Sequence, residues 1–401
     1  MARRQLADFI DAYVAYTDQT EPMQSFHIWC AISAIAGALE RKVYVKLGHQ
    51  KIFPNFYTVL CGPAGWARKG TAIDLIRPIM EGAGIRLMSG AITMERLSQR
   101  LKAAIENYAD PTEGLVKFHC SVTFLSPELQ VFLREKNVDL LGRLTDLYDC
   151  PDPWIYDTKN QGTDYVQGAY FNLLAATAPD WIASMLPDPA IGGGFTRRII
   201  WVVEEDKRTI PRPYIDENLQ EILIKDLEAI GLLAGAAEFT DELWKIYEKW
   251  YHEHDAAFRR GELAVRDPRF SSYCGTRATI LRKLSLIVSV SESSSLIIEP
   301  RHWYRAKEIL EHTERRMPRA FQSMGQARYA DAVQMVFNFL CRRKRVQKAE
   351  ILRWFFRDID EGVYNIVVNT LLRMETIQVR NIEGTEYLEL KEGAENVLDF
   401  R

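Results

Sequence analysis

Little in the sequence indicates a secreted or membrane protein. The 401 residues include six cysteines, which are scattered, with no C-x-x-C pair and no histidine–cysteine cluster at zinc-binding spacing. A disulfide scaffold and a zinc finger are therefore excluded, and we expect reduced thiols, several of them in the core. The longest apolar stretch, Trp29 to Leu39, has about half the length that a bilayer requires. No signal-peptide pattern follows the basic start Met1–Arg4, so we expect a cytoplasmic protein that does not act in a membrane.

The chain also lacks an excess of charge of either sign. Its 51 basic and 54 acidic side chains leave a net charge of −3, so a nucleic-acid partner would need a local basic patch. The apolar content of 47 % and the charged content of 26 % are typical of a globular protein. At 401 residues the chain is too long for one ordinary hydrophobic core, so two or three domains are expected.

One stretch has the order of a phosphate-binding P-loop. A strand-like run, Phe56 to Leu60, leads into a loop that contains glycine, and a helical pattern follows from Ala72. Glycines let backbone N–H groups surround phosphate oxygens, and a helix N-terminus adds partial positive charge. Lys69 would then reach the β- and γ-phosphates of a nucleotide, and Thr71 would offer its hydroxyl to Mg²⁺. The predicted nucleotide-binding residues of the loop are Gly62, Pro63, Ala64, Gly65, Arg68, Lys69, Gly70 and Thr71.

This loop departs from the standard spacing G-x-x-x-x-G-K-[ST]. Gly62 lies one residue too far from Lys69, Arg68 stands where the second glycine belongs, and Gly70 separates Lys69 from Thr71. The Lys-Gly-Thr ending resembles adenylate-kinase loops. The alternative is a Gly/Pro turn with a surface lysine, but the flanking strand and helix favour phosphate binding.

A second buried strand is predicted over Phe118–Leu125, and it is followed by Ser126, Pro127 and Glu128. In P-loop ATPases, acidic residues at such a strand end hold Mg²⁺ and polarise the attacking water. Glu128 fits the water-activating role, whereas Pro127 stands where a magnesium-binding aspartate is expected. Ser-Pro-Glu is also a good helix start, so Glu128 has a structural interpretation as well.

Two short β-rich runs, Trp154–Thr158 and Thr163–Val166, surround a polar turn and predict a hairpin. Its tip carries Lys159 and Asn160, which are candidates for contact with a DNA phosphate backbone. The alternative is an ordinary edge hairpin. A further strand, Ala169–Ala176, ends at Thr177, where a γ-phosphate sensor is expected because ligands bind at the carboxyl edge of parallel sheets.

A glycine-rich loop then presents Arg197 and Arg198 just before a strand, Ile199–Val203. One interpretation is an arginine finger supplied to a neighbouring subunit's nucleotide, and the other is a solvated turn with one arginine in a surface ion pair. The alternation of strands and helices up to this point predicts an α/β fold with a parallel sheet. Residues 214–322 are expected to be helical throughout, and Arg277 lies at a helix start from which it could point toward the nucleotide.

The last residues predict a separate small domain. Three helices, with a basic run Arg342–Arg345 after the first, precede two strands, Ile377–Arg380 and Tyr387–Leu390, which is a winged-helix arrangement. The basic run could contact phosphates, or it is a solvated turn. The expected domains are an N-terminal helical segment (1–50), a P-loop ATPase core (51–210), a helical lid-like domain (211–325) and a winged-helix-like domain (326–401).

Taken in order along the chain, these parts resemble the core of AAA+ hexameric helicases. A closer resemblance is to P-loop ATPases of phages and integrated elements that act as replicative or primase-associated helicases. It covers roughly residues 8–320, and no primase-type zinc knuckle or metal-binding carboxylate cluster is visible. The matching segments are Phe26-His27-Ile28-Trp29, Phe53-Pro54-Asn55-Phe56-Tyr57, Gly62-Pro63-Ala64-Gly65, Arg68-Lys69-Gly70-Thr71 and Gly194-Phe195-x-x-Arg198.

The resemblance implies a ring, expected to be a hexamer, with ATP and Mg²⁺ bound between subunits and single-stranded or forked DNA in the channel. It implies that Glu128 activates water and that Thr177 senses the γ-phosphate. Arg198 would be the finger, with Arg197 as its backup, and the hairpin around Lys159 would grip a DNA strand. A separate primase or polymerase is an expected partner.

These observations favour an ATP-dependent DNA helicase or translocase that acts in phage or mobile-element replication. The alternative is a nucleotide-gated initiator or helicase loader that assembles on DNA without unwinding it. A third hypothesis, a monomeric small-molecule phosphotransferase, rests only on the Lys-Gly-Thr ending of the loop.

Overall fold

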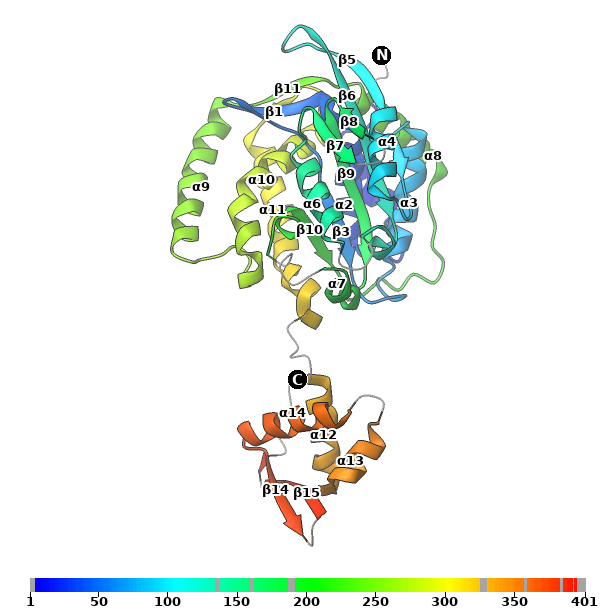
Figure 1. The fold of residues 1–401 in the computed structure, drawn as a ribbon. Coiled ribbons are helices and arrows are strands. Elements are labelled where there is room, and N and C mark those ends of the chain that lie inside the picture. The colour runs from blue at the N-terminus through cyan, green and yellow to red at the C-terminus, as the bar shows by residue number, and fades with distance from the viewer. Residues whose placement is uncertain are drawn as a thin grey trace. The chain divides into compact units, whose positions relative to one another are not determined.

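The computed structural model describes residues 4–133, 137–158, 162–186, 192–324, 330–356, 359–382, 385–391 and 393–394 (Figure 1). It divides the chain into two compact units, Met1–Phe321 and Gln322–Arg401. The segments expected as an N-terminal domain, an ATPase core and a helical lid thus lie in one unit. The break between the units lies close to the boundary expected at residue 326.

The first unit is built on a parallel sheet of five strands, in the order β4-β6-β9-β3-β10. Every residue of the three strands β9, β3 and β10 is buried, as expected for parallel strands covered on both faces. The predicted α/β class with a parallel sheet is therefore confirmed. The strands are β3 (Tyr57–Cys61), β4 (Leu87–Met88), β6 (Leu115–Ser126), β9 (Ala169–Thr177) and β10 (Ile199–Val203).

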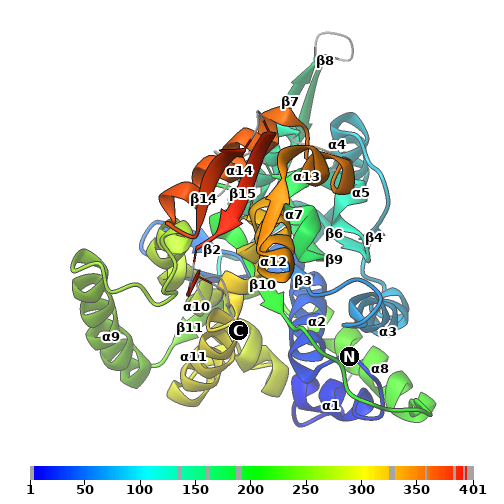
Figure 2. The same cartoon turned by 90° about the horizontal axis from the view of Figure 1, so that it is seen from below.

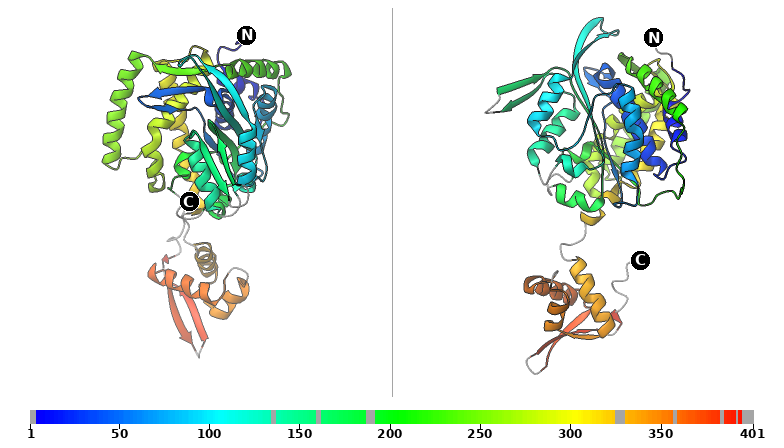
Figure 3. Two further views of the ribbon diagram at one scale, coloured as in Figure 1. Left: turned by 45° about the horizontal axis from the view of Figure 1, so that its top comes forward. Right: turned by 90° about the vertical axis from the view of Figure 1, so that its right-hand side faces the viewer.

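Helices cover both faces of this sheet (Figures 1 and 3). Because side chains alternate along a strand, neighbours in β3 meet different layers. The Tyr57 hydroxyl donates to the Leu144 carbonyl at 2.7 Å, and the hydroxyls of Thr58 and Ser33 lie 3.3 Å apart on the other face. The layer that contains Ser33 comprises α1 (Phe9–Tyr16), α2 (Gln24–Leu39), α3 (Lys69–Gly82) and α8 (Glu217–Gly231); the layer of Leu144 comprises α5 (Leu129–Leu133) and α6 (Val138–Tyr148).

Strand β6 is longer than the sequence predicts. Its first half pairs in antiparallel fashion with β5 (Ile105–Asp110), and its second half pairs in parallel with β9. The sequence pattern does not indicate β5, because this strand needs little apolar surface. All but one of its residues are exposed or half-buried, so pairing with β6 rather than burial defines the strand. The helix α4 (Met94–Ala103) precedes it.

A second sheet, in the order β12-β11-β1-β2, lies in the same unit. The expectation that residues 214–322 are helical throughout was wrong, because this range contains two strands of the second sheet, β11 and β12. Gly235 pairs with Val43 across a parallel ladder, and this long-range pairing outweighs the weak β-propensity of Gly-Ala-Ala. The strands are β1 (Val43–Leu47), β2 (Gln50–Ile52), β11 (Gly235–Phe239) and β12 (Ile297–Ile298), and the helices between and after them are α9 (Asp241–Arg259), α10 (Ser271–Glu292) and α11 (Pro300–Glu314).

The second unit contains three helices and an antiparallel sheet in the order β13-β15-β14. Its own apolar core includes Val336, Leu340, Val367 and Leu388, all fully buried. Sequence reasoning found the helices and two strands but missed β13, which is three residues long. The elements are α12 (Ala330–Arg343), β13 (Arg345–Gln347), α13 (Lys348–Trp354), α14 (Glu361–Arg373), β14 (Ile377–Ile382) and β15 (Thr385–Leu390). Across the described ranges of both units, no helix has the length and apolarity needed to cross a membrane.

Candidate functional site

The loop between β3 and α3 is clamped between the ends of two neighbouring strands. The Gly62 N–H donates to the Thr177 carbonyl at 3.4 Å, which ties the loop to the end of β9. On the other side, a Cβ at residue 62 would lie 2.1 Å from the Glu204 carbonyl oxygen, just past β10. No side chain fits at that separation. The first glycine of the predicted P-loop is therefore required by close backbone approach.

Arg68 adopts the backbone conformation of the glycine that it replaces. Its φ of 54° and ψ of 30° lie in the left-handed region, which glycine adopts without strain. Its guanidinium Nε lies 2.8 Å from a carboxylate oxygen of Glu21, in the turn before α2. Among the described residues, no side chain caps α3, so the first N–H groups of this helix are available to an anion.

The Lys69 side chain folds back over the loop. Its ammonium donates to the carbonyl oxygens of Gly62 at 2.6 Å and Pro63 at 3.0 Å, and only 9 % of the residue is exposed. Burial lowers the pKa of Lys69 below its usual range, whereas Cys61 and Glu128 act in the opposite direction. The loop thus holds a buried cation on carbonyl groups that a phosphate could replace.

The end of β6 faces this lysine. Glu128 immediately precedes α5, so the predicted helix start is confirmed. The hydroxyl of Ser126 accepts from the Glu128 N–H at 3.3 Å and donates to the Glu128 carbonyl at 3.1 Å, which leaves the carboxylate exposed. Pro127 lies against the start of α3: a Cβ atom added to Gly70 would lie 3.8 Å from the Cβ atom of Pro127. The strand end and the helix start therefore border the same space.

Thr177 completes the arrangement from the adjacent strand β9. It lies directly opposite Cys61 in the parallel register, one residue before the loop begins. The residue is buried, and its hydroxyl donates to the Ala178 carbonyl at 3.3 Å. Thr177 therefore reaches the loop through its backbone, and its side chain borders the space in front of Lys69.

These elements surround a cavity of about 280 Å³. The cavity brings together most of the residues predicted from the loop with Glu128 and Thr177, although they come from three separate strand ends. The loop residues Gly62 and Pro63 do not line it, but their carbonyls hold Lys69. The lining residues are Ala64, Gly65, Arg68, Lys69, Gly70, Thr71, Pro127, Glu128, Gln130, Thr177, Ala178 and Trp181.

Sequence reasoning missed two side chains of this cavity. The Gln130 Oε1 atom is buried and has no hydrogen-bond partner among the described residues, which is unfavourable unless a ligand or water supplies a donor. Trp181, at the start of α7 (Pro179–Met185), presents a large aromatic surface with 47 % of the residue exposed. Only their position in the sequence could have indicated them, because each lies within four residues of a predicted site residue at the same sheet edge.

The cavity fits a phosphate group with its cation. An uncapped helix start and a lysine that donates to backbone carbonyls are features that a phosphate group would satisfy. The exposed Thr71 hydroxyl is the candidate Mg²⁺ ligand from α3. Among the described lining residues Glu128 is the one carboxylate, and Pro127 supplies no ligand atom for a metal. The side chain at position 127, where the sequence led us to expect a magnesium-binding aspartate, thus offers no carboxylate.

The two arginines before β10 have different surroundings. Arg198 is buried, donates to the Gly194 carbonyl at 2.8 Å and forms an ion pair with Asp149. Arg197 is half-buried, and its Nε has no hydrogen-bond partner within the described ranges. Neither lines the cavity of its own subunit. The residue preferred as a finger is therefore bound within its own chain, whereas its backup has an unsatisfied guanidinium nitrogen.

Arg277 does not meet the other predicted site residues. It lies in α10, where Glu314 accepts from its Nε at 2.7 Å and from its Nη2 at 2.9 Å. Both residues are buried, and the Tyr273 hydroxyl donates to the same carboxylate. Arg277 is absent from the lining of the cavity. The prediction that it points toward the nucleotide site does not agree with this geometry, because a buried carboxylate already binds its guanidinium in bidentate fashion.

The predicted hairpin is confirmed as the strands β7 (Trp154–Thr158) and β8 (Gly162–Val166), and Figure 3 shows it standing away from the sheet. Lys159 and Asn160, the candidate DNA contacts at its tip, lie outside the described residues. Midway along the hairpin, where Asp164 pairs with Tyr156, the Asp164 carboxylate accepts from Lys102 and Ser98 of α4. The hairpin is therefore anchored at its middle on the helix that precedes β5.

Strands β3, β6 and β9 lie in one sheet (Figure 2). At its carboxyl edge, a buried lysine, a helix hydroxyl, a carboxylate and a polar strand end surround one cavity. Such a set can bind a nucleoside triphosphate and position a water molecule against its terminal phosphate. No protein-family model matches the chain, and a search of curated proteins finds no match to it.

Proposed function

We propose that this protein is a P-loop ATPase of the AAA+ type that uses ATP hydrolysis to move along DNA as a ring. The observation that carries the proposal is the convergence of Lys69, Glu128 and Thr177 on one cavity. They follow or end three different strands, so their meeting is not a consequence of sequence proximity. Ligands of parallel sheets bind at this edge, where strand ends and helix starts coincide.

The strand order supports the AAA+ type over other P-loop folds. Strand β9, which ends in Thr177, lies between the P-loop strand β3 and the acidic strand β6. A strand inserted at this place separates the carboxylate from the lysine by two strand spacings, about 10 Å. That separation leaves room for a terminal phosphate and an attacking water between the two groups.

In this proposal each side chain has one task. Lys69 exchanges its bonds to the Gly62 and Pro63 carbonyls for phosphate oxygens, and the N–H groups at the start of α3 hold the same phosphates. Glu128 accepts a proton from the attacking water. Mg²⁺, when bound, supplies charge neutralisation at the phosphates, and Thr71 is its candidate protein ligand.

The finger is assigned to Arg197 rather than to Arg198. A finger must leave its own subunit to reach the phosphate of a neighbour. Arg198 would have to break an ion pair with Asp149 and a bond to Gly194, whereas Arg197 has a buried nitrogen that lacks an acceptor among the described residues. This reverses the order of preference that the resemblance implied.

The proposal that the protein moves along DNA rests on two other parts of the chain. The β7–β8 hairpin stands away from the sheet, as a strand-gripping hairpin must. The second unit contains three helices with a three-stranded antiparallel sheet, which supports a winged-helix assignment. Within its basic run, Arg343 and Arg345 form ion pairs with Glu350 and Glu389, so DNA phosphates would have to compete with these carboxylates.

The first experiment measures phosphate release from ATP by the full-length protein, with and without a single-stranded oligonucleotide. We expect the oligonucleotide to stimulate hydrolysis, and a labelled forked duplex to be unwound only when ATP is present. Lys69→Ala should abolish both activities, and Lys46→Ala, an exposed lysine on β1, should keep them. Hydrolysis that survives Lys69→Ala would contradict the proposal.

The ring and its finger are tested by mixing variants. Lys69→Ala and Arg197→Ala subunits should each be inactive alone, because every site lacks one component. A mixture should regain activity, since some sites pair an intact Lys69 with an intact Arg197 from the neighbour. Arg198→Ala should instead lower the melting temperature. If the mixture stays inactive although both variants assemble, the proposal that neighbouring subunits share an ATP site is wrong.

The alternative, an initiator or loader that does not unwind DNA, is supported by the second unit, which would bind DNA without any motor step. The forked-duplex assay separates the two functions. Hydrolysis stimulated by DNA but without strand displacement would favour the loader. A mass near that of one subunit in the presence of an ATP analogue would favour a monomeric phosphotransferase instead.

A further inference from the structure

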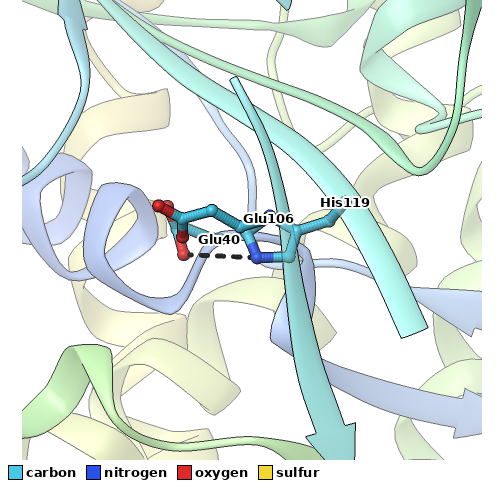
Figure 4. Close-up of side chains that lie close together, drawn as sticks. All are labelled: Glu40, Glu106 and His119. Atoms are coloured by element: carbon cyan, nitrogen blue, oxygen red, sulfur yellow. Dashed lines mark ion pairs between the residues drawn. The ribbon is translucent and has the colours of Figure 1, made fainter. Parts of the chain in front are cut away.

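Three side chains from distant parts of the sequence meet at the edge of the sheet opposite to the P-loop cavity. Glu40 begins the short 3-10 helix η1 (Glu40–Lys42), Glu106 lies in β5 and His119 lies in β6. Glu106 and His119 are directly opposite each other in the antiparallel ladder. Figure 4 shows the imidazole and the two carboxylates pointing toward one another, and one ligand atom from each lies within 4.8 Å of the others.

The imidazole of His119 has an unsatisfied nitrogen. The residue is fully buried, and its Nε2 has no hydrogen-bond partner among the described residues. The nearest carboxylate oxygen, Oε2 of Glu40, lies 3.8 Å away, which is too long for a hydrogen bond. A buried polar atom without a partner is unfavourable, so this nitrogen is expected to bind an ion, another ligand or an ordered water molecule.

The other ring nitrogen of His119 is already held. Its Nδ1 lies 2.8 Å from the Ser121 hydroxyl, two residues along the same strand. When Nδ1–H donates to that hydroxyl, the lone pair of Nε2 faces the two carboxylates. A hydrogen bond of this kind orients the histidine in most metal sites.

Each carboxylate is paired with a cationic side chain that also donates a hydrogen bond to a backbone carbonyl. Lys42 lies 2.7 Å from Glu40 and also donates to the Gly231 carbonyl at 2.6 Å. Arg86 pairs with Glu106 and also donates to the Ala104 carbonyl. Both cations can therefore keep a hydrogen bond when their carboxylate turns toward another ligand. Burial raises the pKa of Glu40, and Lys42 acts against that shift.

We propose that Glu40, Glu106 and His119 bind a divalent transition-metal ion of the Zn²⁺ class, with a fourth position left to water. One nitrogen and two carboxylate oxygens form a donor set that Zn²⁺ accepts, whereas Mg²⁺ and Ca²⁺ prefer oxygen alone. Bonds of about 2.0–2.1 Å in a tetrahedron place ligand atoms roughly 3.4 Å apart. The ligand atoms lie within 4.8 Å of one another, so the group needs a contraction of up to about 1.4 Å, which the exposed Glu106 side chain can supply by a change of rotamer.

The site would connect the end of α2, through η1, to the β5–β6 hairpin, which lies more than 60 residues further along the chain. It is separate from the ATP site, because His119 precedes the parallel part of β6 and Glu128 follows its end. The inference does not depend on the proposed function.

The test uses the full-length protein after removal of metals with a chelator. Zn²⁺ is titrated against a chromophoric chelator to give stoichiometry and affinity, and Co²⁺ is added to record its visible spectrum. We expect one ion per chain and a spectrum of nitrogen and oxygen ligands without thiolate bands. His119→Gln should weaken binding by more than about 100-fold, since even outer partners of metal ligands change affinity 10- to 100-fold. His312→Gln, at an exposed histidine of α11, is the matched control.

A second variant makes the test independent of folding defects. Lys42 places a positive charge beside the site, so Lys42→Met should tighten Zn²⁺ binding by about tenfold. Ser121→Ala should weaken it by about tenfold, because His119 loses the hydroxyl that orients it. Binding that is absent from the wild type, unchanged in folded His119→Gln, or accompanied by thiolate bands would overturn the proposal. Binding that Lys42→Met leaves unchanged or weakens would also overturn it.

Discussion

The two edges of the parallel sheet are built from similar side chains in different surroundings. At the carboxyl edge, Glu128 is exposed beside a lysine that only backbone carbonyls hold. At the amino edge, Glu40 and Glu106 are already paired with Lys42 and Arg86. The carboxyl edge therefore has groups that a ligand must satisfy, whereas at the amino edge most groups satisfy one another.

This contrast has a physical consequence. A charge in a cavity can act on a bound substrate, but a charge in a closed network contributes mainly to folding. Changes at the carboxyl edge should lower activity and leave stability almost unchanged. Changes at the amino edge should lower stability and leave the activity of each folded molecule unchanged. Five substitutions test whether the two edges differ in this way.

The largest effect is expected for Lys69→Ala. Loss of a preorganised cation at the phosphates should lower the rate of ATP hydrolysis by about 10²- to 10³-fold, or about 3–4 kcal/mol. Phosphate release measures the rate, and Lys46→Ala serves as control for loss of an exposed lysine. A rate within a few-fold of the wild-type rate would show that the carboxyl edge is not the site of ATP hydrolysis.

Glu128→Gln should lower hydrolysis by about 10²-fold, because the amide cannot accept the proton of the attacking water. Nucleotide binding should remain, since Lys69 and the start of α3 are untouched. Fluorescent-nucleotide titration and phosphate release together separate binding from turnover. The control is Glu242→Gln, an exposed glutamate in the first turn of α9. Equal losses of binding and turnover would speak against a role in water activation.

Arg41→Met tests the amino edge. The buried guanidinium donates to the carbonyls of Ala169 at 2.8 Å and of Cys150, and methionine would leave both without a donor. The free energy of unfolding should fall by about 2–3 kcal/mol. Urea denaturation measures it, and the rate of hydrolysis is compared per folded molecule. Arg259→Met, an exposed arginine in α9, should change stability by less than about 0.5 kcal/mol.

Gly168→Ala should lower stability by about 1–3 kcal/mol. Gly168 has a φ of 56°, and a Cβ there would lie 2.4 Å from the Phe118 carbonyl oxygen. Gly142, within α6, faces open space in the described structure, so Gly142→Ala should instead stabilise the protein by about 0.4–1 kcal/mol. Thermal unfolding of the pair gives the comparison. Equal effects of the two changes would show that the turn before β9 is looser than its geometry indicates.

The smallest effect is expected for Gln130→Ala at the carboxyl edge. The orphaned Oε1 atom should find a donor only when nucleotide or its water is bound, so KM should rise a few-fold, or about 1 kcal/mol. The melting temperature should stay the same or rise. A fall in stability without a change in KM would place Gln130 among the structural residues.

Much of the carboxyl edge was predictable because its elements are local. The strand β3, the loop and the start of α3 follow one another, and their sequence pattern predicted all three. The conformation of Arg68 was not predictable, since a left-handed arginine is uncommon and depends on the strand ends around it. The order of strands in the sheet was not predictable either, because the sequence does not indicate which strands are neighbours.

The features that the sequence did not indicate depend on partners that lie far away in the chain. Arg277 was assigned to the nucleotide site from its place at a helix start, but Glu314 of the next helix binds it. The preference for Arg198 came from the family pattern, and its ion pair with Asp149 could not be read from spacing. Strand β11 was missed because its residues form a strand only through pairing with β1.

Local sequence patterns predicted the alternation of strands and helices, the glycine-containing loop between β3 and α3 and the separate last unit, because these depend on periodicity and on residues close together in the chain. The tertiary structure decided which strand ends surround one cavity, which arginine is bound within its chain, and that Glu40, Glu106 and His119 meet. Histidine–cysteine spacing could not have indicated that group, since Glu106 and His119 meet through strand pairing and Glu40 joins them from η1. Contacts between distant residues arise from packing, which local sequence patterns do not specify.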